Sequence, residues 1–202
     1  MIVLGVVAAV FILANIILLS INLDKIKELT GQVTRGEVNV TVGGVAVLNF
    51  TTWQVNLGSG AVDEAGGFVN ATVSTKSGVS LGGSGWSTGM GGLVIENTGN
   101  VNLSLGLKGD HNAANLIGGT NPQYQWLLSG DPSDAEDNSC KTYHTGSVVD
   151  TWYDVNSTQG FCDKFQPNDA ADSIMIHFKF VIALDASTGA RGDNITAIFS
   201  AT

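Results

Sequence analysis

The fold is decided by the stretch from Ile174 to Ile182, which reads IMIHFKFVI. Large apolar side chains occupy every second position, and this spacing continues to Leu184. Successive side chains of a β-strand point to opposite faces of its sheet, so a period of two predicts a long strand with one buried face. His177 falls between Ile176 and Phe178, and we expect its side chain on the solvent face.

The same alternation recurs in several other places along the chain. The other alternating sets are Val38, Val40 and Val42; Trp53, Val55 and Leu57; Val69, Ala71 and Val73; Val101, Leu103, Leu105 and Leu107; Tyr124, Trp126 and Leu128; and Ile195, Ala197 and Phe199. Glycine-rich turn signals separate them, and the chain has 26 glycines with only 13% charged residues. Short strands joined by turns predict an all-β head at 35–202, an antiparallel, immunoglobulin-like β-sandwich.

One turn resembles a unit common in secreted β-sandwiches. Residues Leu93 to Leu103 read LVIENTGNVNL, which is a strand, an Asn-Thr-Gly turn and a second strand. The glycine-rich stretches Gly82–Gly85 and Gly89–Gly92 have no following Gly-Lys-Ser/Thr, so they are expected to be connectors or sites of close chain packing, not phosphate loops.

The charge is acidic and concentrated in one segment. The net charge is −9, and nine of the eighteen acidic residues lie between Asp131 and Asp172. Such a surface repels phosphate backbones, so no nucleic-acid partner is expected. Segment 131–172 has little periodicity and is interpreted as an elaborated, outward-facing loop.

The two cysteines, Cys140 and Cys162, fall within this segment without a second pair that could complete a zinc site. A disulfide is the simplest interpretation, and two free thiols are the alternative. A disulfide closing such a loop stabilises the fold by roughly 3 kcal/mol and persists in an oxidising compartment or inside some hyperthermophiles. The expected location is therefore extracellular.

The sequence also contains acceptor motifs for N-linked glycans, of the form Asn-x-Ser/Thr. The candidate sites are Asn39, Asn49, Asn70, Asn102, Asn156 and Asn194. Asn39, Asn102 and Asn194 lie between apolar neighbours, so their side chains are expected on the wet face of strands. The alternative is that asparagine and threonine merely occupy exposed strand faces.

No pattern indicates an enzyme or a cofactor. The histidines His111, His144 and His177 are far apart in the sequence and match no nucleophile or zinc motif. Four carboxylates, on Asp131, Asp134, Glu136 and Asp137, could hold calcium, but their spacing is not that of an EF-hand and a solvated acidic loop is favoured. Arg191-Gly192-Asp193 is an adhesion tripeptide in other systems, but here its surroundings have the composition of a plain turn.

The N-terminal segment differs from the rest. No charged residue occurs between Met1 and Leu23, a length that can cross a bilayer as a helix. Ile26, Leu29 and Val33 continue at helical spacing, so a long helix is expected over residues 1–34. The basic opening and small-residue cleavage site of a secretory signal peptide are missing.

An uncharged apolar start of this kind, Met1 to Val7, resembles a mature type IV pilin or archaellin, in which the apolar helix remains on the processed subunit. Bacterial type IV pilins usually have glutamate at the fifth mature position and phenylalanine at the first, whereas this chain has Gly5 and Met1. The resemblance is therefore to the archaeal branch. It implies a membrane-inserted precursor, a pilus assembly machinery as partner and a helical homopolymer used for adhesion, surface attachment or motility.

The resemblance also implies which side chains would pack in the filament core. They are Met1, Ile2, Val3, Leu4, Val6, Val7, Val10, Phe11, Leu13, Ile16, Ile17, Leu18, Ile21, Ile26 and Leu29. The alternative is a monomeric surface protein, either a binding module or an envelope component, anchored in the membrane by the same segment. Polar Asn15 and Ser20 favour contact with other copies, because polar groups in hydrocarbon seek partners.

Overall fold

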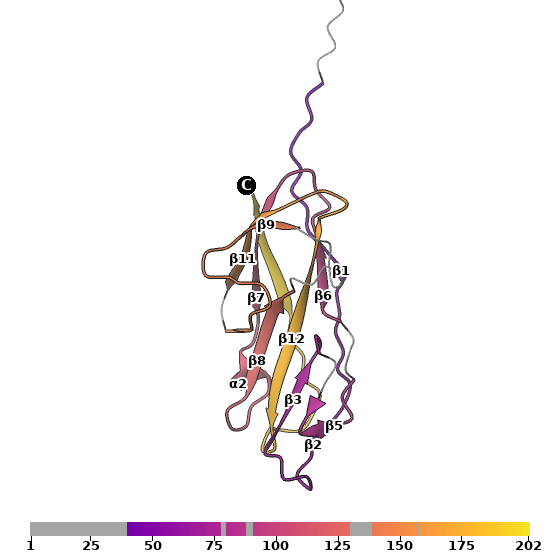
Figure 1. Cartoon of the computed structure of the whole chain (residues 1–202), viewed down its shortest axis with the longest axis vertical. Helices are drawn as coiled ribbons and strands as arrows, with labels where there is room; N and C mark the ends of the chain where they lie inside the picture. Colours follow the sequence, from indigo (N-terminus) through magenta and orange to yellow (C-terminus); the bar gives the residue numbers. More distant parts are fainter. Residues whose placement is uncertain (1–39, 78–79, 88–90, 130–138, 157) are drawn as a thin grey trace, which may run out of the picture. The chain divides into compact units, whose positions relative to one another are not determined.

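The structure is a computed structural model that describes residues 40–77, 80–87, 91–129, 139–156 and 158–202 (Figure 1). The chain divides into two units, 1–42 and 43–202. The second unit is called the head below. Of the first unit, only residues 40–42 are described.

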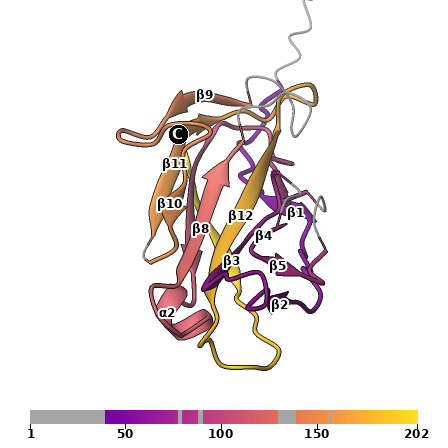
Figure 2. The same cartoon turned by 60° about the horizontal axis from the view of Figure 1, so that its bottom comes forward.

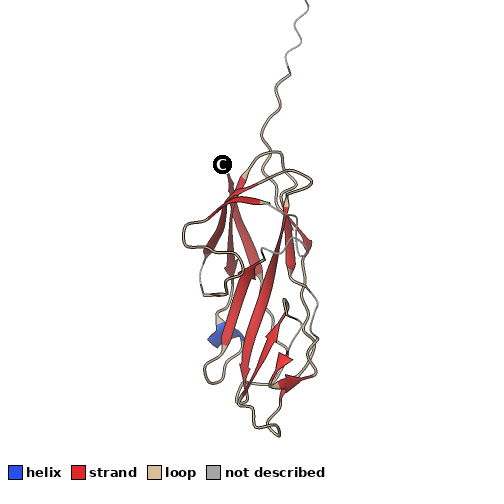
Figure 3. Ribbon diagram, viewed as in Figure 1, coloured by secondary structure: helices blue, strands red, loops and turns tan. Residues whose placement is uncertain are grey.

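The head is built almost entirely of antiparallel strands (Figure 3). The strands are β1 (Asn49–Thr52), β2 (Ala61–Val62), β3 (Asn70–Ser74), β4 (Ser80–Leu81), β5 (Gly83–Ser84), β6 (Leu93–Glu96), β7 (Leu103–Gly109), β8 (Gln123–Leu128), β9 (Cys140–Tyr143), β10 (Tyr153–Asp154), β11 (Gln159–Phe165), β12 (Ser173–Ala183) and β13 (Ile195–Ala201). One short helix, α2 (Ala113–Leu116), precedes β8 and is capped by the Asn112 side chain, which accepts from the Asn115 amide.

The fold class expected from the sequence, a long helix joined to a β head, is corrected by these elements. The structure is nearly all β, and α2, with four residues, is the longest helix in the described part of the chain. No helix among the described residues is long and apolar enough to cross a membrane. The segment 1–34 on which the long helix was expected lies outside the described residues.

Strand β12 organises the larger sheet, as the IMIHFKFVI pattern predicts. Its first half pairs with β6 and its second half with β3, while β8 runs along its other side (Figure 2). The larger sheet has the order β1-β6-β12-β3-β4, with β8 and β10 attached beyond β12. The smaller sheet has the order β13-β7-β11-β9, and β2 and β5 form a separate pair.

The two main sheets bury one shared core. Ile174, Ile176 and Phe178 of β12 lie in it with Leu103, Leu105 and Leu107 of β7 and with Phe161 and Phe165 of β11. Trp126 of β8 is fully buried and meets Phe161 edge-to-face at 5.7 Å between ring centroids. This packing is compatible with the predicted β-sandwich, whereas the immunoglobulin-like topology stays a prediction.

Two of the predicted strands are wrong. Val40 and Val42 are 79% and 77% exposed and belong to no strand, and Val38 lies outside the described residues. In the second set, Trp53 follows the end of β1 and is 73% exposed, while Val55 packs against the core without joining a sheet. Alternation gives a segment one apolar face, but a strand also needs a partner for its backbone hydrogen bonds.

The sequence predicts one elaborated loop over 131–172, and this prediction is wrong. It contains β9, β10 and β11, and β11 joins the smaller sheet between β7 and β9. The pairing of β11 is irregular, with register shifts between Gly160 and Cys162 and between Cys162 and Phe165. A register shift interrupts the period of two, which explains why these strands show little alternation.

Candidate functional site

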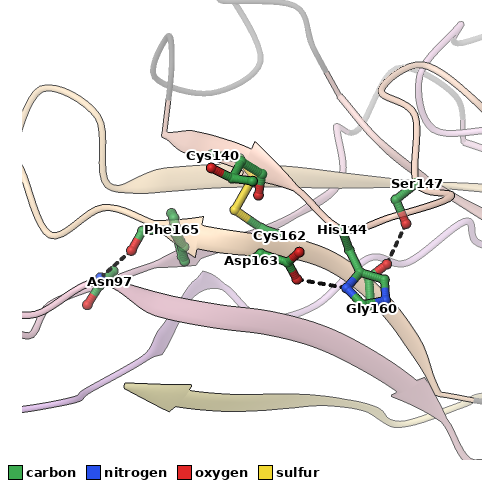
Figure 4. The surroundings of a disulfide bond; sticks show 9 residues. Asn97, Cys140, His144, Ser147, Gly160, Cys162, Asp163 and Phe165 are labelled. Atoms are coloured by element: carbon green, nitrogen blue, oxygen red, sulfur yellow. Dashed lines mark hydrogen bonds and ion pairs between the residues drawn. A yellow bond between two sulfur atoms is a disulfide. The ribbon is translucent and has the colours of Figure 1, made fainter. Parts of the chain in front are cut away.

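The disulfide between Cys140 and Cys162 joins two neighbouring strands of the smaller sheet, β9 and β11 (Figure 4). The Cα atoms lie 5.8 Å apart and both residues are buried, at 7% and 1% exposure. The predicted disulfide is therefore confirmed, and it ties the edge strand β9 to the core of the head.

A histidine lies beside this disulfide, on the chain that follows β9. His144 Nδ1 is 2.7 Å from Asp163 Oδ1, and both side chains are about half exposed. The imidazole also covers Gly160, where an added Cβ would lie 2.7 Å from its Cδ2 atom. Ser147 donates through its hydroxyl to the Gly160 carbonyl (Figure 4). These contacts close the loop after β9 against β11.

Asn97 joins the two sheets at the turn predicted from Asn-Thr-Gly. Its side-chain nitrogen donates to the carbonyls of Val101, at 3.0 Å, and Phe165, at 3.2 Å, and the residue is 1% exposed. The Gly99 amide donates to the side-chain oxygen of Asn97, Oδ1. The turn after β6 of the larger sheet is thereby fixed to β11 of the smaller sheet.

Asn100, at the end of the same turn, forms hydrogen bonds with the first residues of the head. Asn100 Oδ1 accepts from the Val45 amide at 2.6 Å, and Asn100 Nδ2 donates to the Gly43 carbonyl at 3.0 Å. The Asn100 amide also donates to the Val45 carbonyl. One asparagine thus satisfies three backbone groups of the segment through which the chain enters the head.

His177 on β12 has a partner of its own, Thr75, away from the disulfide. His177 is on the face opposite to Ile176 and Phe178, but the expectation that it meets solvent is wrong: it is 2% exposed, with Nδ1 3.2 Å from the Thr75 hydroxyl. The Thr75 hydroxyl also accepts from the Phe178 amide. The outer face of the large sheet is therefore covered at this point.

The Arg191-Gly192-Asp193 tripeptide lies between β12 and β13, as expected for a connecting segment. The Asp193 carboxylate accepts from the backbone and the ring of His111, at 3.0 and 2.8 Å, and its side chain is 3% exposed. Burial, and secondarily the Asp193 carboxylate, raise the pKa of Tyr124. Asp193 is thus a structural carboxylate, with too little exposed surface to be presented to an adhesion receptor.

Five of the six glycan candidates lie in the described part of the head. Asn49 and Asn70 begin β1 and β3 and are exposed, as are Asn156 and Asn194. Asn102 is half-buried. Asn102 and Asn194 directly precede β7 and β13, so the expectation that they lie within strands is wrong. Asn39 lies outside the described residues.

The calcium candidates Asp131, Asp134, Glu136 and Asp137 and all the predicted core contacts from Met1 to Leu29 also lie outside the described residues. Among the residues that the structure does describe, no three His, Cys, Asp or Glu side chains gather as a metal site.

A basic and aromatic group on the larger sheet was missed by the sequence reasoning. Lys179 Nζ lies 4.8 Å from the centre of the Trp152 ring, although the two residues are 27 positions apart (179 − 152). The polar position of Lys179 between Phe178 and Phe180 was visible in the alternation, but its neighbours across the sheet were not.

Comparison with models of protein families, with curated proteins and with solved structures found no match.

Proposed function

We propose that this chain is a structural subunit of an extracellular filament of the archaeal type IV pilus kind, which polymerises through its apolar N-terminal segment. The observation that carries the proposal is that one chain combines an uncharged, apolar segment with a polar head. The stretch 1–23 has no charged side chain, whereas the head is a disulfide-linked antiparallel fold in a chain of net charge −9.

The energetics of the apolar segment favour association. Burying one large apolar side chain stabilises an assembly by roughly 1.5–3 kcal/mol, so about fifteen such side chains in 1–29 would hold copies together strongly in water. Before assembly the same segment requires the apolar interior of a membrane. The partners proposed are therefore other copies of the chain, the membrane and a pilus assembly machinery, with no nucleic acid.

The head has features suited to the outside of a cell. Its disulfide persists in an oxidising compartment, and four asparagines of Asn-x-Ser/Thr motifs are exposed. We propose that the heads form an acidic, glycan-bearing outer layer that serves adhesion, surface attachment or motility.

A charge placed in the apolar segment tests the proposal. Val10→Glu should abolish polymer, because burying an unpaired carboxylate costs several kcal/mol, whereas Val10→Leu should assemble as the unaltered chain does. The measurement is the fraction of chain pelleted by ultracentrifugation after shearing from cells, with the Cys140–Cys162 disulfide checked to show that the head has folded. If the unaltered chain is recovered only as a detergent-soluble monomer, the membrane-anchored surface protein replaces the filament subunit.

A further inference from the structure

A shallow recess of about 450 Å³ lies over the larger sheet, on the face turned away from the core. Its lining includes Thr72 and Ser74 of β3, Leu81 of β4, Lys179 of β12 and, from outside these strands, Lys76 and Trp152. Small-ligand sites combine apolar surface with a few polar groups in this range of volumes.

The strand register explains why these side chains meet. Lys179 pairs with Ser74, and Thr72 pairs with Leu81 and with Val181, so all of them point to the same face. On the other side of β12, Lys179 pairs with Gln125 of β8. The recess is therefore based on three strands of one sheet, which hold its hydroxyls and its lysine in fixed positions.

Trp152 and Leu81 supply the apolar surface. Leu81 is 63% exposed and Trp152 is half-buried, so both present apolar atoms to the recess. An aromatic ring has a negatively charged face that attracts cations and the partly positive C–H groups of other molecules. The Lys179 ammonium uses one such contact with Trp152 already.

The two lysines differ in their partners. Lys76 forms an ion pair with Asp150. Among the described residues, no carboxylate lies within ion-pair distance of Lys179, and partial burial lowers its pKa despite the opposing effect of Asp154. An ammonium that has lost part of its hydration without gaining a carboxylate is a favourable place for an external anion.

We propose that this recess binds an acidic saccharide. The sugar carboxylate would accept from Lys179, the C–H face of the ring would lie on Trp152 and Leu81, and a sugar hydroxyl would meet the half-buried Thr72. Charge complementarity favours an anion here, because the Lys179 ammonium lines the recess without an ion-pair partner among the described residues. The inference concerns the head and is independent of polymerisation, so its failure would leave the filament proposal untouched.

The test is titration calorimetry of the full-length chain in nonionic detergent with digalacturonic acid and with galactobiose, its uncharged counterpart. We expect the acid to bind at least about tenfold more tightly than the neutral disaccharide. Lys179→Met keeps the aliphatic stem and should remove that preference, while Trp152→Ala should weaken binding of the acid at least about tenfold. Lys108→Met and Trp53→Ala are matched controls outside the recess and should bind as the unaltered chain does.

Three results would overturn the proposal. The first is no heat of binding at millimolar digalacturonic acid, and the second is equal binding by Lys179→Met and the unaltered chain. The third is inorganic sulfate binding as tightly as the saccharide and independently of Trp152, which would leave an anion site without sugar recognition. Thermal unfolding of each variant checks its fold, and Trp152→Phe, which keeps an aromatic face, is expected to bind between Trp152→Ala and the unaltered chain.

Discussion

The side-chain amide of Asn97 donates to the Phe165 carbonyl at 3.2 Å and thereby links the turn after β6 to β11 of the opposite sheet. The same nitrogen donates to the Val101 carbonyl, and Asn97 is 1% exposed. A buried amide in this position acts as a fixed contact between the two sheets, because the carbonyl of the fully buried Phe165 has no water as a ready replacement.

Replacement of this amide should destabilise the head. Asn97→Ala leaves the carbonyls of Val101 and Phe165 without this donor, and we expect a loss of about 1–3 kcal/mol in the free energy of unfolding. Urea denaturation followed by tryptophan fluorescence measures it. Asn168→Ala, at an exposed position, is the control and should change stability by less than about 0.5 kcal/mol. Equal stability of both variants would show that the Asn97 contacts contribute nothing net.

Loss of the disulfide should be measurable in the same assay. The double variant Cys140→Ser, Cys162→Ser should lose about 3 kcal/mol, because the bond restricts the unfolded chain across a sequence separation of 22 residues. Reductant should destabilise the unaltered chain by a similar amount and leave the double variant unchanged. A reductant effect that persists in the double variant would contradict this assignment.

Asp185 should make stability depend on pH in the acid range. Its side chain accepts from the Thr120 hydroxyl and from the Thr120 amide, at 2.7 and 2.8 Å, and these bonds lower its pKa from 3.8. A carboxyl whose pKa is lower in the folded state stabilises the fold above the unfolded pKa and loses this contribution as pH falls through the folded value.

Asp185→Asn should therefore lower Tm at pH 6 but approach the Tm of the unaltered chain at a pH well below 3.8, once the pH has fallen through the lowered pKa of Asp185. Thermal unfolding followed by circular dichroism at both pH values checks this. Glu64→Gln, on an exposed turn, is the control. A Tm difference for Asp185→Asn that is the same at both pH values would mean that ionisation of Asp185 has no part in it.

Close packing should make one glycine irreplaceable. A Cβ at Gly60 would lie 2.2 Å from the Trp86 ring and 2.6 Å from the Ser84 carbonyl oxygen. Gly60→Ala must shift backbone or ring and should cost about 1–3 kcal/mol. At Gly192 nothing lies within 4 Å of an added Cβ, so Gly192→Ala should be neutral or slightly stabilising. Denaturant midpoints of the two variants compare them directly, and equal midpoints would contradict the tight packing at Gly60.

The strands with regular alternation and a partner could be predicted from the sequence. Strands β7, β8 and β12 each place every second side chain in the core, as their patterns require. Alternation cannot reveal register, however, and register brings Lys179 opposite Ser74. Trp152 contacts Lys179 from outside the strands, which alternation cannot show either. The candidate recess was therefore beyond sequence reasoning, although each of its side chains was visible.

The errors have the same physical origin. His177 is buried and contacts Thr75, which is 102 residues away in sequence, so its burial does not follow from the local alternation. Cys140 and Cys162 could be paired because few alternatives existed, but the register shifts around Cys162 concealed that they lie on strands. Contacts between distant segments decided these features, and local pattern carries no information about them.

The measurement that tests the central proposal most directly is electron microscopy of the fraction sheared from cells that make this chain, with the polymer's subunit identified by N-terminal sequencing. We expect uniform filaments whose subunit contains the apolar segment Met1 to Leu23 together with the head. Recovery of the intact chain only in the detergent phase, without polymer in the sheared fraction, would contradict it.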